Sequence, residues 1–237
     1  MGRESRRPRR DRVRTGNGKL GQARAYGGWG SRDRQTGADL DEAKAEARVH
    51  ASQQGLPFFE DGAEPAQYEG YGAIADEILA QAPDPPAAIV VPLGNGALLG
   101  GIGLATSRAA PKVERIGVAA KEAPVMVESW NAGRPVPSER SATFADGLAV
   151  RVAIPLAVEV LGEVATRMVL VSERRIAEAV GEYGSVGVRA EGAAAAALAA
   201  VPGLDEVGDP LVLVVTGRNI DDELFRQACE HPDSFPD

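Results

Sequence analysis

Uninterrupted apolar runs alternate with longer segments in which apolar residues recur every three to four positions. The runs are AAIVV (87–91), VERIGVAA (113–120), RMVLVS (167–172) and LVLVV (211–215), and LPFFE (56–60) is a shorter one. Continuous apolar runs are typical of strands that are buried on both faces of a sheet.

The segments between the runs have the apolar period of amphipathic helices. The predicted helices span residues 38–54, 71–82, 97–110, 123–133, 154–165, 173–187, 191–201 and 220–230. Strands that alternate with helices predict an α/β fold, with a mostly parallel sheet and helices on both faces.

The most apolar stretch, residues 87–105, reads AAIVVPLGNGALLGGIGLA, and Asn95 is its one polar side chain. Five glycines and Pro92 interrupt it, and it has no aromatic residues at its ends. These features argue against a membrane span, so no membrane association is expected. The stretch instead predicts a buried strand, a glycine turn and a helix.

Ligands of parallel α/β proteins bind where strands end and helices begin, so the glycine turn at 93–96 is a candidate phosphate site. A P-loop is excluded because no lysine follows the glycines. Two alternatives remain: the glycines only allow close helix packing, or they form a dinucleotide loop. In the second case Gly94 and Gly96 are followed by a late glycine at Gly100, and Glu122 would bind the ribose.

Charge is distributed unevenly over the 237 residues. Residues 1–18 hold seven arginines against Glu4 and Asp11, a charge of +5, so the net charge of −8 leaves −13 on the rest. We expect a disordered basic leader and no nucleic-acid binding, because an acidic body repels phosphate backbones. The single cysteine, Cys229, gives no disulfide framework and favours a reducing, cytoplasmic location.

Several motifs, taken together, resemble the fold type II pyridoxal-phosphate enzymes, in the threonine/serine dehydratase branch. VVPLGNGALLGGIGLA resembles their phosphate-binding loop, and further resemblances follow in family order between residues 19 and 223. They are KLGQARAYG, YGAIADEIL, TFADGLAV, VRAEGAAAAALAAV and VVTGRNID. The resemblance implies that pyridoxal 5'-phosphate is the cofactor and that this chain lacks the N-terminal part of the family fold.

The resemblance also implies residue roles. Thr216 would hydrogen-bond the pyridine nitrogen, Glu191 would be an acid lining the site, and Gly147 would form a turn against the cofactor. Backbone amides of the glycine loop would hold the phosphate, at Gly94, Asn95, Gly96, Ala97 and Leu98.

The chain departs from the family in its lysines. The family's Schiff-base lysine lies in an upstream Ser-x-Lys motif, and none of Lys19, Lys44, Lys112 and Lys121 has that context. No catalytic residue is therefore assigned. Residues 28–37 are also polar where the family has a buried strand, which suggests a truncated or frame-damaged reading frame. Some relatives bind a metal through acids after the next strand, but Lys121-Glu122 does not reproduce that pattern, so no metal site is predicted.

The implied function is a PLP-dependent threonine/serine dehydratase that converts a hydroxy amino acid to a 2-oxo acid and ammonia. The alternatives are an inactive fragment or a non-catalytic phosphate-ligand-binding protein, favoured by the missing lysine, and an NAD(P)-dependent oxidoreductase. The expected domains are a basic leader (1–18), a remnant of the small domain (19–55) and a large PLP-phosphate-binding domain (56–237). An apolar surface left by the missing part could drive homo-oligomer formation.

Overall fold

The computed structural model describes residues 11–14, 32–35, 40–138 and 141–237. The chain forms two compact units, residues 1–59 and 60–237. In the first unit, strands β1 (Asp11–Arg14) and β2 (Arg32–Gln35) pair in parallel, and helix α2 covers Leu40–Gln54. The guanidinium group of Arg48 lies over the ring of Phe58, 5.4 Å from its centre.

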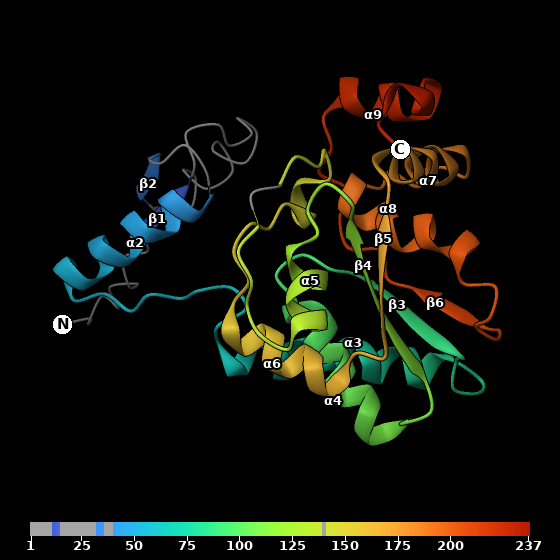
Figure 1. Cartoon of the computed structure of the whole chain (residues 1–237), viewed down its shortest axis with the longest axis horizontal. Coiled ribbons are helices and arrows are strands. Elements are labelled where there is room, and N and C mark those ends of the chain that lie inside the picture. Colours follow the sequence, from blue (N-terminus) through green and yellow to red (C-terminus); the bar gives the residue numbers. More distant parts are fainter. Residues whose placement is uncertain (1–10, 15–31, 36–39, 139–140) are drawn as a thin grey trace, which may run out of the picture. The chain divides into compact units, whose positions relative to one another are not determined.

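The second unit is built on a four-stranded parallel sheet (Figure 1). Its strands are β3 (Ala88–Pro92), β4 (Glu114–Ala120), β5 (Arg167–Val171) and β6 (Leu211–Leu213), in the spatial order β5-β4-β3-β6. Ala88 of the central strand lies opposite Glu114 on one side and Leu211 on the other. Because all four strands run the same way, their carboxyl ends lie at one edge of the sheet.

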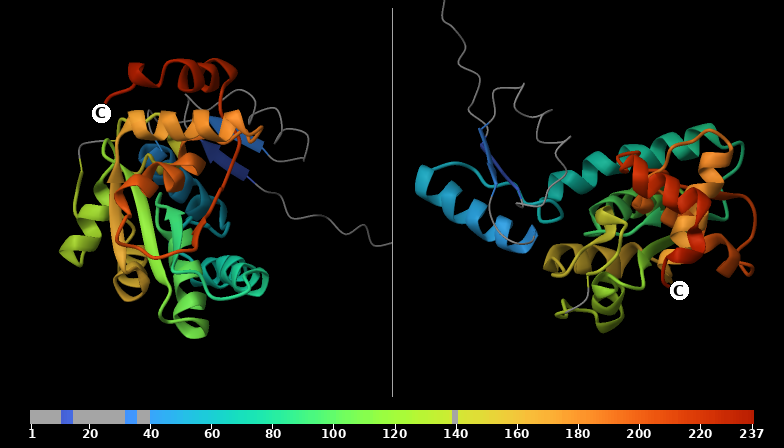
Figure 2. Two further views of the ribbon diagram at one scale, coloured as in Figure 1. Left: turned by 90° about the vertical axis from the view of Figure 1, so that its right-hand side faces the viewer. Right: turned by 90° about the horizontal axis from the view of Figure 1, so that it is seen from above.

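Helices cover both faces of this sheet (Figures 1 and 2). One group comprises α3 (Pro65–Gln81), α4 (Ala97–Ala109), α5 (Val125–Ala132) and α6 (Pro155–Val164). The other comprises α7 (Glu173–Ser185), α8 (Gly192–Ala200) and α9 (Asp222–Glu230). The described residues of the unit also form three short 3-10 helices, at Asp146–Leu148, Val201–Gly203 and Pro232–Ser234.

The alternation of side chains along β3 divides the core in two. Ala88 and Val90 pack in the cluster that contains the alanines of α8, whereas Ile89 and Val91 pack with residues of α4, α5 and α6. All four side chains have no exposed surface, which is why the strand is apolar at every position.

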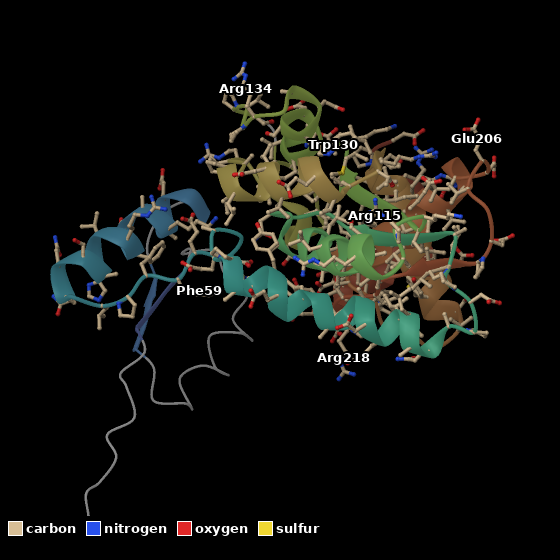
Figure 3. The ribbon with its side chains drawn as sticks, turned by 90° about the horizontal axis from the view of Figure 1, so that it is seen from below. Phe59, Arg115, Trp130, Arg134, Glu206 and Arg218 are labelled. Atoms are coloured by element: carbon tan, nitrogen blue, oxygen red, sulfur yellow. The ribbon has the colours of Figure 1, made fainter. Side chains whose placement is uncertain are left out.

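Two aromatic side chains join the helices of the α3–α6 group. A β-carbon built on Gly100 of α4 would lie only 2.6 Å from the ring of Tyr68 on α3. Trp130 on α5 donates from Nε1 to the carbonyl oxygen of Leu161 on α6 at 3.1 Å, and Figure 3 shows Trp130 beside that helix. The first contact packs α3 against α4, whose N-terminus follows the glycine turn, and the second joins α5 to α6.

The predicted fold class is confirmed, and three details of the prediction are wrong. Residues 56–60 form no strand, since no neighbouring strand pairs with them in the described part of the chain and Pro57 has no amide donor. Helix α3 begins at Pro65 rather than residue 71, because proline is favoured in the first turn of a helix. Within the segments predicted to be irregular, Asp11–Arg14 and Arg32–Gln35 pair as strands.

Candidate functional site

The candidate site lies at the carboxyl edge of the parallel sheet, around the glycine turn after β3. Three other segments reach this edge: residues 121–124 after β4, the turn at 143–147, and residues 214–221 after β6. The hydrogen bond from Val214 N to Val90 O, 3.0 Å long, extends the pairing of β3 with the last of these segments.

The glycine turn presents backbone amides at the N-terminus of α4. Gly96, the residue before the helix, has φ of 94°, a conformation that glycine adopts without strain. The side chain of Asn95 accepts from the amide of Ala97 at 3.1 Å. Among the described residues, no acceptor faces the amides of Gly94, Asn95, Gly96 and Leu98. These four donors are therefore available to an external acceptor.

The turn at 143–147 closes against the glycine turn. A β-carbon built on Gly94 would lie 2.5 Å from the carbonyl oxygen of Gly147. A β-carbon on Gly147 would in turn lie 2.8 Å from the β-carbon of Ala193 on α8. The two predicted site glycines, far apart in the sequence, are thus in direct backbone contact, and small residues on α8 make room for them.

Glu191 connects α8 with the segment after β6. Its Oε2 accepts from the amide of Asn219 at 2.8 Å, and its own amide donates to the carbonyl oxygen of Gly217 at 3.1 Å. A β-carbon on Gly217 would lie 2.6 Å from Glu191 Oε1, so a larger residue there would displace the carboxylate. Glu191 is also the residue before α8, and its carbonyl oxygen accepts from Ala195 N at 3.0 Å in the first turn of that helix.

Thr216 lies at the same edge, beyond the last paired residue of β6, and its side chain is exposed. The structure therefore brings the glycine turn, Gly147 and Glu191 into one connected set of contacts, and it places Thr216 in the segment that Glu191 holds. Gly217 and Asn219 belong to that set but were not predicted as site residues. The sequence signal for them is the turn motif Thr216-Gly217-x-Asn219 shortly after an apolar run.

A phosphate group fits the glycine turn. Four amides of the turn have no acceptor among the described residues, and the positive end of the helix dipole adds to their attraction for an anion. The close approach of Gly94 to Gly147 leaves no room for a side chain at residue 94. Within the described residues, no cluster of histidine, cysteine, aspartate or glutamate side chains could hold a metal ion. No described helix is long and apolar enough to cross a membrane.

The comparisons with known proteins agree on one family. The family described as Pyridoxal-phosphate dependent enzyme matches residues 11–217. The L-threonine ammonia-lyase of Thermotoga maritima is 35% identical over 184 residues, 77% of this chain and 46% of that protein. The biosynthetic L-threonine dehydratase of Lactococcus lactis is 31% identical over 215 residues, 88% of this chain and 52% of that protein.

Solved structures agree with this. The processed form of threonine deaminase isoform 2 from Solanum lycopersicum superposes with a TM-score of 0.82 at 27% identity, covering 90% of this chain and 63% of that one. A crystal structure of the T.th. threonine deaminase gives a TM-score of 0.76 at 28% identity, with 84% and 66% covered. The chain spans about half the length of the curated relatives it matches.

Proposed function

Because the chain belongs to the pyridoxal-phosphate dependent enzyme family, we propose that residues 60–237 hold the phosphate of pyridoxal 5'-phosphate at the turn after β3. The observation that carries this proposal is the set of amides at Gly94, Asn95, Gly96 and Leu98, which have no acceptor among the described residues. A phosphate dianion accepts several hydrogen bonds and is favoured by the N-terminus of a helix.

We propose that this cofactor site serves the deamination of L-threonine or L-serine to a 2-oxo acid and ammonia. The support is that the matched relatives include an L-threonine ammonia-lyase and L-threonine dehydratases. The bound cofactor would supply an aldehyde for the substrate amine and an aromatic ring that accepts electrons. Thr216 would hydrogen-bond the ring nitrogen, and Glu191 would hold the segment that carries it by accepting from Asn219.

The lysines of the described residues support a binding role more than catalysis by this chain. Lys112 precedes β4, at the edge of the sheet opposite the glycine turn, and Lys44 belongs to the first unit. Lys121 follows β4 at the carboxyl edge, with an exposed side chain. Covalent PLP catalysis needs an amine that is activated, for example by desolvation, and the Lys121 side chain is exposed. We therefore expect reversible cofactor binding without a lysine adduct.

A cofactor titration tests the proposal. Purified chain is titrated with PLP and followed by absorbance, with inorganic phosphate as competitor, and is then reduced with borohydride and weighed intact. Saturable binding that phosphate displaces, with no mass added, is the expected result. A stable adduct on Lys121 would instead mean that this lysine serves the chemistry. No binding at all, or binding of a nicotinamide dinucleotide in place of PLP, would overturn the proposed function.

Substrate conversion is tested separately. The PLP-loaded chain is incubated with L-threonine or L-serine, and 2-oxo acid release is followed against free PLP at equal concentration. We expect no rate above that of free PLP from this chain alone, because none of its lysines lies in the Ser-x-Lys context of the family. A rate well above it would assign the deamination to this chain alone, and the preferred amino acid would then identify the substrate.

We further propose that the protein is located in the cytoplasm and that copies of the chain associate with one another. Apolar side chains exposed on the second unit support this: Val186 and Val188 after α7 are 73% and 41% exposed, and Val215 after β6 is 45% exposed. Exposed apolar surface favours association. Light scattering that gives the mass of one chain at high concentration would overturn the proposed association, and cell fractionation tests the location.

A further inference from the structure

We propose that Glu173 is a positioning residue, whose buried carboxyl group holds the turn at 143–147 where Gly147 meets the glycine turn. Glu173 is the first residue of α7, directly after Ser172, which caps that helix. Its side chain is only 3% exposed. A glutamate is rarely buried to this extent unless its carboxyl group is well hydrogen-bonded, so its partners are informative.

Those partners all belong to the turn. Glu173 Oε2 accepts from the amide of Phe144 at 2.9 Å and from the hydroxyl of Thr143 at 3.0 Å. The Thr143 hydroxyl has one proton, which goes to Glu173, so its oxygen is free to accept from the amide of Ala145 at 3.0 Å. One carboxyl oxygen therefore fixes three consecutive residues.

The next residues carry this constraint to the candidate site. Ala145 leads directly into the 3-10 helix Asp146–Leu148, and the carbonyl oxygen of Gly147 there lies against Gly94. Ahead of the turn, the amide of Ala142 donates to the carbonyl oxygen of Glu122 at 2.9 Å. Main-chain pairing thus holds the residue just ahead of the turn, Glu173 holds its first two residues, and Gly147 at its end meets the glycine turn.

Both hydrogen bonds need an acceptor oxygen, which a neutral carboxyl group also supplies. Burial raises the pKa of the Glu173 carboxyl, and the neighbouring charge of Glu122 raises it further, although the Phe144 amide and the Thr143 hydroxyl act in the opposite direction. Oε1 has no partner among the described residues. A glutamine at this position keeps one acceptor oxygen for both donors and is therefore expected to replace the glutamate.

The test uses three variants of the whole chain and a control. Glu173→Ala removes the acceptor, Glu173→Gln keeps it, and Thr143→Val removes the relay to Ala145 without changing the side-chain volume much. Glu178→Gln is the control, because Glu178 lies on the same helix with an exposed ion pair to Arg175. Amide hydrogen exchange of residues 142–148 and PLP affinity are measured for each, together with the free energy of unfolding.

We expect Glu173→Ala to speed exchange at Phe144 and Ala145 about tenfold and to weaken PLP binding by a similar factor. Glu173→Gln and the control should stay close to the parent protein in both measurements. Thr143→Val should speed exchange at Ala145 more than at Phe144, and it decides the matter if Glu173→Ala does not fold. Unchanged exchange in Thr143→Val and in a folded Glu173→Ala, or a Glu173→Gln protein as impaired as Glu173→Ala, would overturn the inference.

The expectation for affinity rests on the proposed function, whereas the exchange measurement does not. If the parent chain fails to bind PLP, the proposed function fails and the exchange rates still judge Glu173. If PLP binds and the exchange rates do not respond to the variants, the positioning role alone is wrong.

Discussion

Gly94 and Gly147 meet so closely that no side chain fits at residue 94 without a shift of the main chain. A β-carbon on Gly94 would be 2.5 Å from the Gly147 carbonyl oxygen, well inside the contact distance of a carbon and an oxygen atom. The obstructing atom belongs to the main chain, so it cannot rotate away as the end of a flexible side chain could. A side chain at residue 94 would therefore push apart the two segments that form the candidate phosphate site.

The first prediction concerns Gly94→Ala. The added methyl group should lower the free energy of unfolding by about 1–3 kcal/mol, as overpacking does elsewhere, and weaken PLP binding about tenfold or more. Urea denaturation and PLP titration measure the two effects. Gly162→Ala is the matched control, because Gly162 is exposed on α6 and its β-carbon would contact nothing.

The control should behave in the opposite way. Alanine is favoured over glycine inside a helix by about 0.5–1 kcal/mol, so Gly162→Ala should stabilise the chain and leave PLP binding unchanged. Equal PLP affinity in Gly94→Ala and the parent protein would show that the glycine turn does not hold the phosphate.

The second prediction is a coupling between Gly217 and Glu191. Gly217→Ala should destabilise the chain, since its β-carbon would press on the Glu191 carboxylate at 2.6–2.8 Å. In a Glu191→Ala background that carboxylate is gone, so the same change should cost about 1 kcal/mol less. A double-mutant cycle from urea denaturation measures the coupling. Additive effects would mean that the two residues do not restrain each other.

The sheet is the part of the fold that the sequence predicts best. Strands β3 and β4 lie in the middle of the sheet, where both faces are covered, and their apolar runs were recognised almost to the residue. Strand β6 is shorter than its apolar run because it pairs only with β3 among the described strands, and only over Leu211–Leu213. The strand predicted over residues 56–60 does not form, because a short apolar run shows hydrophobicity but not whether a partner strand exists.

The candidate site could be predicted only in part from the sequence. A glycine-rich turn after a buried strand by itself predicts a phosphate site, whereas the predictions for Gly147, Glu191 and Thr216 rest on resemblance to a family. Glu173 could not have been found, because Ser-Glu after a strand has the pattern of an ordinary helix start. Its importance comes from Thr143 and Phe144, about thirty positions away, and that contact exists only once the sheet has formed.

The third prediction concerns Arg115 on β4, which lies inside the second unit (Figure 3). Its side chain is 8% exposed and donates to backbone carbonyl oxygens: Nε to Val164 at 2.6 Å, and one terminal nitrogen to Val113 at 2.5 Å. Arg115→Met removes both donors and leaves buried acceptors unpaired, so it should cost about 2 kcal/mol or more in urea denaturation.

Arg167→Met is the comparison for this variant. Arg167 is also on the sheet, but its ion pair with Glu114 is 3.8 Å long and both side chains are 35% exposed. Such pairs contribute about 0–1 kcal/mol, so this variant should be nearly as stable as the parent protein. Equal losses in the two arginine variants would contradict a special role for the buried hydrogen bonds.

The fourth prediction is a pH dependence at Tyr68. Its hydroxyl donates to the carbonyl oxygen of Gly62 at 2.7 Å, and burial, with a smaller effect of Asp61, raises its pKa from 10.0 to about 12. The folded state therefore retains this proton at pH values where the unfolded chain has lost it. Stability from Tyr68 is complete below pH 10 and declines as the pH rises towards 12.

Tyr68→Phe should isolate this effect. At neutral pH the variant should be about 1 kcal/mol less stable than the parent protein, because the Gly62 carbonyl loses its donor. By pH 11 the parent should have lost about 1 kcal/mol through this group, so the two free energies of unfolding should converge. Urea denaturation of both proteins between pH 8 and pH 11 measures the difference, and a gap that stays constant would mean that the Tyr68 hydroxyl titrates as it does in the unfolded chain.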